Sequence, residues 1–211
     1  MLALIISDTH GDDSRILTIR RSLSENLDVL IHAGDIGGSE QFYRDYLRCQ
    51  CHIVCGNTDW SGRLPETDIF SLGSHRVFLT HGHRYHVDFA GPEAVADAAR
   101  QNGCDIAIFG HTHVPLLAQY GGVLVMNPGS LSRPRQPGYR PTYILLRIDD
   151  RTGELHPEIK TRQGQTAVMP RVRGLPDPFW TGSPLCRTPP SAPWRRRASR
   201  PCAQSQYGQP T

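Results

Sequence analysis

The chain lacks any apolar run long enough to cross a membrane. Apolar stretches such as residues 2–6 are far shorter than the ~20 residues that a membrane-spanning helix needs. A signal-peptide pattern is also missing, because Met1 leads directly into this short stretch and then into Asp8. We therefore expect no membrane span and a cytoplasmic location.

Cysteine patterns are missing as well. The chain has six cysteines, and their spacing fits neither a zinc knuckle nor a CxxC redox motif. Thiols without an export signal are typical of the reducing cytoplasm, which agrees with the expected location.

The body of the chain has no excess of basic residues. The formal net charge is +3, but seven arginines and a single acid, Asp177, lie from Pro170 onward. Residues 1–169 carry 16 basic and 19 acidic residues, so the overall pI is no argument for nucleic-acid binding by the body.

The last part of the chain also lacks hydrophobic periodicity. Residues 170–211 hold nine of the chain's 17 prolines, and such a stretch cannot bury enough apolar surface to offset its chain entropy. We predict one folded domain over residues 1–165 and a disordered tail, rich in proline and arginine, over residues 166–211.

Short polar motifs follow the apolar runs of the body, and they are rich in glycine, histidine and carboxylates. There are five of them, in this order: Asp8-Thr9-His10, Gly34-Asp35, Gly56-Asn57-Thr58-Asp59, His81-Gly82-His83 and Gly110-His111-Thr112-His113. Each motif lies where a predicted strand ends.

The order of predicted elements favours an α/β fold. Strands over residues 2–6, 28–32 and 52–55 alternate with helices that begin near Asp12 and Ser39, which indicates parallel crossovers. The later part contains closely spaced strands around Gly73-Ser74, Gly121-Gly122 and residues 149–153, which are typical of hairpins. Two mixed sheets packed face to face, with helices outside, accommodate both halves.

The side chains of the motifs suit divalent metal ions. Asp8 and His10 are alternate residues, so both can address one ion, whereas Asp35 can bridge two. Asn57 offers a neutral oxygen, and His111 and His113 are again alternate residues. Loops at the carboxyl ends of strands meet in one crevice, and a mixed oxygen and nitrogen set suits first-row metals.

The ordered set of motifs resembles the calcineurin-like metallophosphoesterases, and among them the small phosphodiesterases of the YfcE type. The resemblance covers about residues 1–160, and it includes Asn127-Pro128-Gly129-Ser130 and Arg133-Pro134. It implies a four-layer αββα sandwich of two mixed β-sheets flanked by helices.

The resemblance also implies a dinuclear metal site. It assigns a first ion to Asp8, His10, Asp35 and His113, and a second ion to Asp35, Asn57, His81 and His111. Two Mn²⁺ ions are the first expectation, and Fe, Zn or Ni would accept the same ligands. With two ions the site keeps a charge of about +2, which favours an anionic phosphate ester.

The implied activity is hydrolysis of a phosphate diester by a metal-bridging hydroxide, with Asp35, Asn57 and His83 as catalytic residues. Many superfamily members have a histidine after the motif asparagine that can protonate the leaving group, whereas this chain has Thr58. Asp59 is expected to orient a ligand, and His83 to contact the phosphate or support a ligand. Arg133 and Arg135 either bind phosphate or belong to a solvated loop.

Two alternatives stay open. The first is a phosphomonoesterase, because a doubly charged monoester also suits a site of charge +2. The second is a catalytically silent protein-interaction scaffold, because a retromer subunit resembles this chain over the same region. That lineage has lost part of the ligand set, whereas all seven ligand positions are filled here. The diester could be a cyclic nucleotide, a nucleic-acid end or a phospholipid headgroup, and no pattern encodes or excludes a homo-oligomer.

Overall fold

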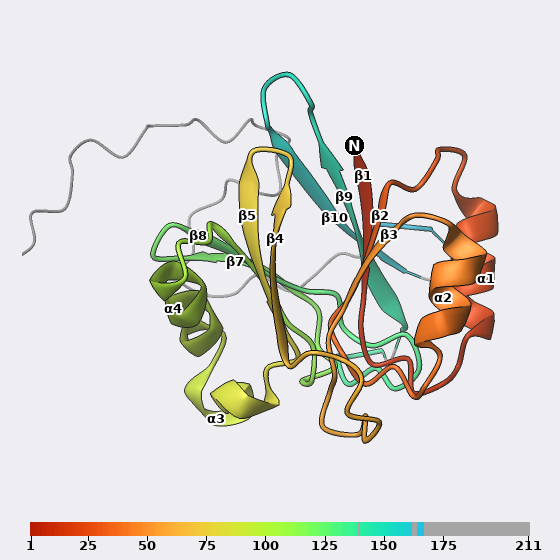
Figure 1. Cartoon of the computed structure of the whole chain (residues 1–211), viewed down its shortest axis with the longest axis horizontal. Coiled ribbons are helices and arrows are strands. Elements are labelled where there is room, and N and C mark those ends of the chain that lie inside the picture. The colour runs from red at the N-terminus through yellow and green to blue at the C-terminus, as the bar shows by residue number, and fades with distance from the viewer. Residues whose placement is uncertain (139, 162–163, 167–211) are drawn as a thin grey trace, which may run out of the picture.

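Two β-sheets face each other in the computed structural model of the chain, and helices cover their outer faces (Figure 1). The structure describes residues 1–138, 140–161 and 164–166. This α/β architecture confirms the predicted sandwich of two mixed sheets. The predicted disordered tail lies almost entirely outside the described residues, so it stays a prediction.

The first sheet has the strand order β10-β9-β1-β2-β3. Its strands β1, β2 and β3 are parallel, and β9 and β10 are antiparallel to their neighbours. Their bounds are β1 (Leu2–Ile6), β2 (Val29–His32), β3 (Gln50–Ile53), β9 (Thr142–Ile148) and β10 (Leu155–Thr161). Two crossover helices, α1 (Ser14–Ser22) and α2 (Glu40–Leu47), connect the parallel strands and pack on the outer face.

The second sheet has the order β4-β5-β6-β8-β7, with hairpins at its edges and parallel strands in its centre. Its strands are β4 (Thr67–Leu72), β5 (His75–Thr80), β6 (Ile106–Ile108), β7 (Leu116–Tyr120) and β8 (Val123–Asn127). Helix α4 (Glu93–Gln101) covers the outer face of this sheet, and the short elements η1 (His83–Tyr85) and α3 (Val87–Ala90) precede it.

Three apolar layers hold the four layers of structure together. The central layer lies between the sheets and includes Ile5, Ile31 and Ile108. A second layer joins the first sheet to its helices, and a third joins the other sheet to α4. The continuous apolar run of β1 follows from this arrangement, because all five of its residues are buried between two layers.

Some predicted details are wrong. From the sequence we expect the first helix to run to about Glu25 and Ser39 to cap the second. Helix α1 ends earlier, at Ser22, and Ser39 is the N-cap residue of α2, but its hydroxyl donates to Asp13 and not to the helix. Elements η1 and α3 were not expected, since a turn this short has no hydrophobic period to reveal it. No helix among the described residues is long and apolar enough to cross a membrane.

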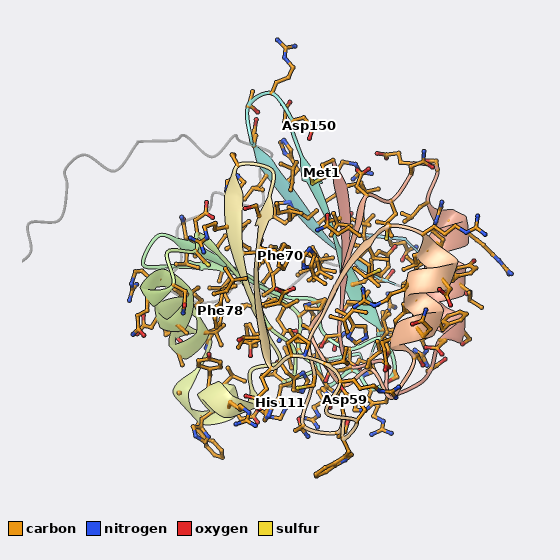
Figure 2. The ribbon with its side chains drawn as sticks, in the orientation of Figure 1. Met1, Asp59, Phe70, Phe78, His111 and Asp150 are labelled. Carbon is orange, nitrogen blue, oxygen red and sulfur yellow. The ribbon has the colours of Figure 1, made fainter. Side chains whose placement is uncertain are left out.

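The ends of the central strands meet at one edge of the sandwich. The Asp8 amide donates to the Gly34 carbonyl at 3.0 Å, and the Gly110 amide donates to the His81 carbonyl at 3.1 Å. Figure 2 shows His111 and Asp59 together at this edge, whereas Met1 and Asp150 lie at the opposite edge. The fold therefore gathers the five motifs in one place.

Candidate metal centre

Asp8 and His113 form a buried ion pair in the site. The Asp8 carboxylate is fully buried, and its Oδ1 lies 3.1 Å from His113 Nε2. Burial raises the pKa of Asp8, but His113 and His81 outweigh it and hold the pKa below its ordinary value. Burial lowers the pKa of His113, yet the Asp8 carboxylate raises it overall. Asp8 is therefore a fixed negative charge at the base of the site.

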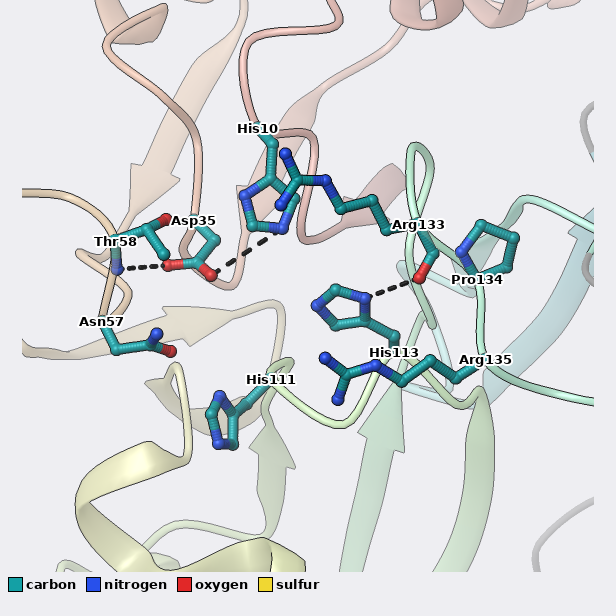
Figure 3. Close-up of a pocket in the computed structure, with 9 residues that line it drawn as sticks. All are labelled: His10, Asp35, Asn57, Thr58, His111, His113, Arg133, Pro134 and Arg135. Atoms are coloured by element: carbon teal, nitrogen blue, oxygen red, sulfur yellow. Dashed lines mark hydrogen bonds and ion pairs between the residues drawn. The ribbon is translucent and has the colours of Figure 1, made fainter.

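Asp35 lies between the other motifs. Its Oδ2 is 3.8 Å from His10 Nε2 and 3.6 Å from His81 Nε2, while its Oδ1 accepts from the Thr58 amide at 2.9 Å (Figure 3). Because Asp35 Oδ1 is engaged by the Thr58 amide, Oδ2 is the oxygen that faces the rings of His10 and His81. This is the placement that a ligand shared by two ions requires.

Backbone carbonyls fix the tautomers of two histidines. His81 Nδ1 donates to the Ala33 carbonyl at 2.7 Å, and His113 Nδ1 donates to the Arg133 carbonyl at 2.6 Å. In each neutral ring, Nε2 therefore carries a bare lone pair. Second partners of this kind are what orient metal-ligating histidines in proteins.

Lone pairs consequently face one another across the site. His81 Nε2 lies 3.1 Å from Asn57 Oδ1, and His113 Nε2 lies 3.1 Å from Asp8 Oδ1. Among the described residues, the buried atoms Asp8 Oδ1 and His10 Nε2 have no partner in hydrogen-bonding geometry. When the rings of His81 and His113 are neutral, these acceptors face acceptors, and a cation bound between them would satisfy both, so these residues fit a bound metal.

Two groups of side chains could each hold an ion. One is Asp8, His10 and His113, and the other is Asp8, Asp35 and His81, with ligand atoms within 4.8 Å of one another in each group. The implied ligand set differs in two respects, because it gives Asp8 to the first ion only and gives His111 to the second. In the structure Asp8 belongs to both groups and His111 to neither.

His111 turns one ring nitrogen away from the carboxylates. Its Nε2 lies 2.8 Å from Asp88 Oδ2 of helix α3, while its backbone amide donates to Asp8 Oδ2 at 3.2 Å. The ring still lines the cavity beside Asn57, and its centroid is 5.2 Å from that of His81. With Nε2 held by Asp88, Nδ1 is the nitrogen that remains for a ligand.

His83 lies next to His81 and His111. Its ring centroid is 5.4 Å from that of His81 and 6.1 Å from that of His111, but it does not line the cavity itself. Burial lowers its pKa, and the charges of His81 and His111 lower it further. A neutral His83 with a buried Nδ1 is placed to support its neighbours, so the catalytic role expected for it stays a prediction.

Most of the residues that line the cavity beside these side chains are polar or charged, and two of them are arginines. The cavity measures about 420 Å³, and its lining includes Arg133, Pro134 and Arg135 together with His10 and Asn57 (Figure 3). The charge of Arg133 acts on His10, whose pKa is lowered first by burial and then also by this guanidinium. Arg135 acts on His113 in the same direction, but Asp8 outweighs it and raises the pKa of His113 overall. Guanidinium groups here would bind phosphate oxygens.

Backbone strain is concentrated on the candidate ligands. Left-handed φ angles of 46° to 64° occur at Asp8, His10, Asp35, His111 and His113. Such angles cost of order 1–3 kcal/mol for a residue with a side chain, and they cluster at functional sites. The hydrogen bonds around these residues hold each of them in its strained backbone conformation.

Supporting residues from other parts of the chain complete the site. Ser130 and Ser132 both donate to the Asp8 carbonyl, at 2.9 and 2.8 Å, and Asn127 Nδ2 donates to the Gly110 carbonyl at 2.8 Å. Asp59 accepts from the amides of Ile36, Gly37 and Gly56, so it joins the second and third motifs.

Sequence reasoning missed Asp88 altogether. It belongs to no motif, and its only signal is a position seven residues after His81, in the segment that precedes α4. Ser130 was noticed only as part of a family-like segment, without a role.

Comparisons with known proteins agree with this geometry. The calcineurin-like phosphoesterase superfamily domain matches residues 1–151. A probable metallophosphoesterase of Mycoplasma genitalium is 35% identical over 148 residues, which are 69% of this chain and 86% of that protein. The phosphodiesterase YfcE of Escherichia coli K12 is 44% identical over 64 residues, 30% of each chain.

Solved structures show the same fold. A predicted phosphoesterase from Streptococcus pneumoniae matches with a TM-score of 0.67 and 27% identity, over 79% of this chain and 92% of that chain. Vps29 of Entamoeba histolytica, solved with Zn²⁺, matches with a TM-score of 0.62 and 28% identity, over 76% of this chain and 92% of that chain. On this evidence the chain belongs to the calcineurin-like phosphoesterase superfamily.

Proposed function

We propose that the protein is a dinuclear metal-dependent phosphodiesterase. The observation that carries the proposal is the pair of carbonyl-anchored histidines whose free Nε2 atoms face Asp8 and Asn57. The protein fixes acceptor atoms around two positions and places two arginines above them. Such a site would bind cations among the acceptor atoms and a phosphate next to the arginines.

The proposed ions would be held by the seven residues of the five motifs. Asp8, His10 and His113 would hold one ion, and Asn57, His81 and His111 the other, with Asp35 between them. When bound, two such ions lower the pKa of a bound water from ~15.7 toward ~7 and offset charge on the phosphoryl oxygens. Mn²⁺ is our first choice for both.

The protein's own groups would position the ester. Arg133 and Arg135, which line the same cavity as the metal ligands, would bind the non-bridging oxygens, and the Asn57 amide would fix the geometry beside Asp35. Thr58 is a poor general acid, so good leaving groups should react faster than poor ones.

The experiment is hydrolysis of bis-p-nitrophenyl phosphate by metal-stripped protein as Mn²⁺ is added. We expect activity to appear with the metal and to fall at least about 100-fold in His111→Ala, because a ligand is lost. His156→Ala is the matched control, since His156 is an exposed residue of β10 far along the chain from the motifs. Folded protein that is inactive with Mn²⁺, Fe²⁺, Zn²⁺ and Ni²⁺ would refute the proposal and favour a scaffold.

A phosphomonoesterase is the second candidate, and the two arginines favour it. They add positive charge to a site that already keeps about +2 with two ions, which suits a dianionic monoester. Rates on p-nitrophenyl phosphate and on methyl p-nitrophenyl phosphate separate the two functions, because the leaving group is the same. The diesterase predicts the higher kcat/KM for the methyl ester.

A further inference from the structure

A second cavity adjoins the metal cavity. It measures about 250 Å³, and Thr58 lies on the boundary because it lines both cavities. The residues that line it include Ile36, Leu64 and Trp60, together with Gly37 and Gly38. None of the metal ligands lines it, so the proposed chemistry leaves this space without a role.

Trp60 is the most unusual feature of this wall. Trp60 follows Asp59 in the sequence. The Asp59 carboxylate accepts hydrogen bonds from three backbone amides, yet Trp60 itself is 90% exposed. Covering a large aromatic ring is favourable because it removes apolar surface from water. Single exposed rings are ordinary on protein surfaces, so exposure alone indicates no function. Here the ring borders a cavity next to the proposed reaction centre, on a fixed backbone.

The charges of the two cavities are opposite. Two arginines and one acid, Asp35, line the metal cavity, whereas the charged groups among the described residues that line the second cavity are both acids, Glu40 and Asp59. Asp59 is occupied by backbone amides, while the one ionic partner of the Glu40 carboxylate in the described part of the chain is Arg63 Nη2 at 3.7 Å, too long for a hydrogen bond. The second cavity therefore repels a further phosphate and accepts a neutral group with hydrogen-bond donors.

We propose that this cavity binds the nucleoside arm of a nucleotide ester. The base stacks on Trp60, an amino or hydroxyl group of the nucleoside donates to Glu40, and the attached phosphate lies in the metal cavity beyond Thr58. A nucleoside combines a planar uncharged ring, hydrogen-bond donors and a direct link to phosphate, whereas a glycerol headgroup offers no ring to stack. The inference rests on the proposed function, because it names the substrate class of that site.

Calorimetry on the full chain with Mn²⁺ tests the proposal with two ligands that differ only in the base. Adenosine 5′-monophosphate should bind about tenfold or more tightly than ribose 5-phosphate, as expected for one stacked base. In Trp60→Ala the two affinities should agree within about twofold, while that for ribose 5-phosphate stays unchanged. Trp60→Phe should keep most of the preference, because a ring remains.

Phe89→Ala is the matched control. Phe89 is 94% exposed on α3 but lines neither cavity, so its truncation should leave the preference intact. Equal binding of the two ligands by the wild type, a preference that survives in Trp60→Ala, or no binding of either ligand would overturn the proposal. A preference for the base in protein that hydrolyses no ester would uphold this cavity and refute the enzyme, so the two failures are distinguishable.

Discussion

His32 is fully buried near the candidate metal ligands Asp8 and Asp35, and its hydrogen bonds require the neutral ring. The Gly34 amide donates to His32 Nδ1 at 3.2 Å, so the ring proton lies on Nε2 and points to Thr9 Oγ1 at 3.0 Å. Burial lowers the pKa of His32 to about 4, from an ordinary value of 6.5. A protonated ring would lose its bond from Gly34, the residue that precedes Asp35.

We predict that stability falls as the pH is lowered from about 6.5 to about 4. In this window the unfolded chain binds a proton at His32 and the folded chain does not, so the free energy of unfolding rises with pH. The contribution is about 3 kcal/mol, from about 1.4 kcal/mol for each unit of pKa. Urea unfolding at several pH values measures it, and a His32→Gln variant with the same pH slope would contradict it.

Asp88 is the second residue whose role can be tested. Because its carboxylate holds His111 Nε2 at 2.8 Å, we expect Asp88→Asn to weaken one of two Mn²⁺ sites by about 10–100-fold, as partners of metal ligands usually do. Calorimetric titration of metal-stripped protein measures both affinities. Asp97→Asn, which removes an exposed acid of α4 paired with Arg100, should change neither. Equal affinities in wild type and Asp88→Asn would show that His111 needs no such support.

The loops that follow the strands pack so closely that Gly56 and Gly110 have no room for a Cβ atom. A Cβ added to Gly56 would collide with the Oδ1 atom and the backbone nitrogen of Asp35, and one added to Gly110 would collide with Ser7 Oγ. These contacts explain why glycine accompanies the motifs: the loops of different strands touch through their backbones.

Gly56→Ala should therefore damage the site more than the fold. Displacement of Asp35 should weaken Mn²⁺ binding at both positions by at least tenfold, with a loss of stability of about 1–3 kcal/mol. Gly103→Ala serves as a control, because its Cβ meets open space and only its φ of +68° is strained. Unchanged metal affinity in Gly56→Ala, measured beside the thermal midpoint, would contradict this account of the loops.

The elements were predictable to different degrees. The hairpins predicted around Gly73 and Gly121 are confirmed, because alternation and turn glycines are local signals. Helix α3 was not predictable, since four residues that follow the left-handed His86 carry no periodic pattern. Its side chain Asp88 reaches His111 only in the folded chain, so no spacing in the sequence reveals the pair.

The site was predictable as a set of residues but not as a geometry. The five motifs indicated which side chains converge, because they follow strands whose ends share an edge. The carbonyls of Ala33 and Arg133, which fix the tautomers of His81 and His113, are backbone atoms and leave no mark in the sequence. The second cavity arises in the same way, from loops that meet only in three dimensions.

For the whole molecule, the strained ligand residues and the facing lone pairs imply that metal binding stabilises the fold. At a free metal concentration 100 times Kd, binding to the folded state contributes about 2.7 kcal/mol. Removal of the metal should therefore lower the thermal midpoint by roughly 5–10 °C for a chain of this size. Calorimetric scans with Mn²⁺ and with EDTA measure the shift, and Asp35→Asn should show almost none. A midpoint that ignores the metal would contradict the account.

The number of Mn²⁺ ions bound per chain tests the central claim most directly. Asp35 Oδ2 faces both His10 and His81, so the account predicts two ions in the wild type and loss of high-affinity binding at both positions in Asp35→Asn. Asparagine keeps the Oδ1 acceptor for the Thr58 amide, so the loop should stay in place. Titration calorimetry that finds two sites in the wild type and none of comparable affinity in the variant would establish the shared ligand. One ion or none in folded wild-type protein, or two in Asp35→Asn, would contradict it.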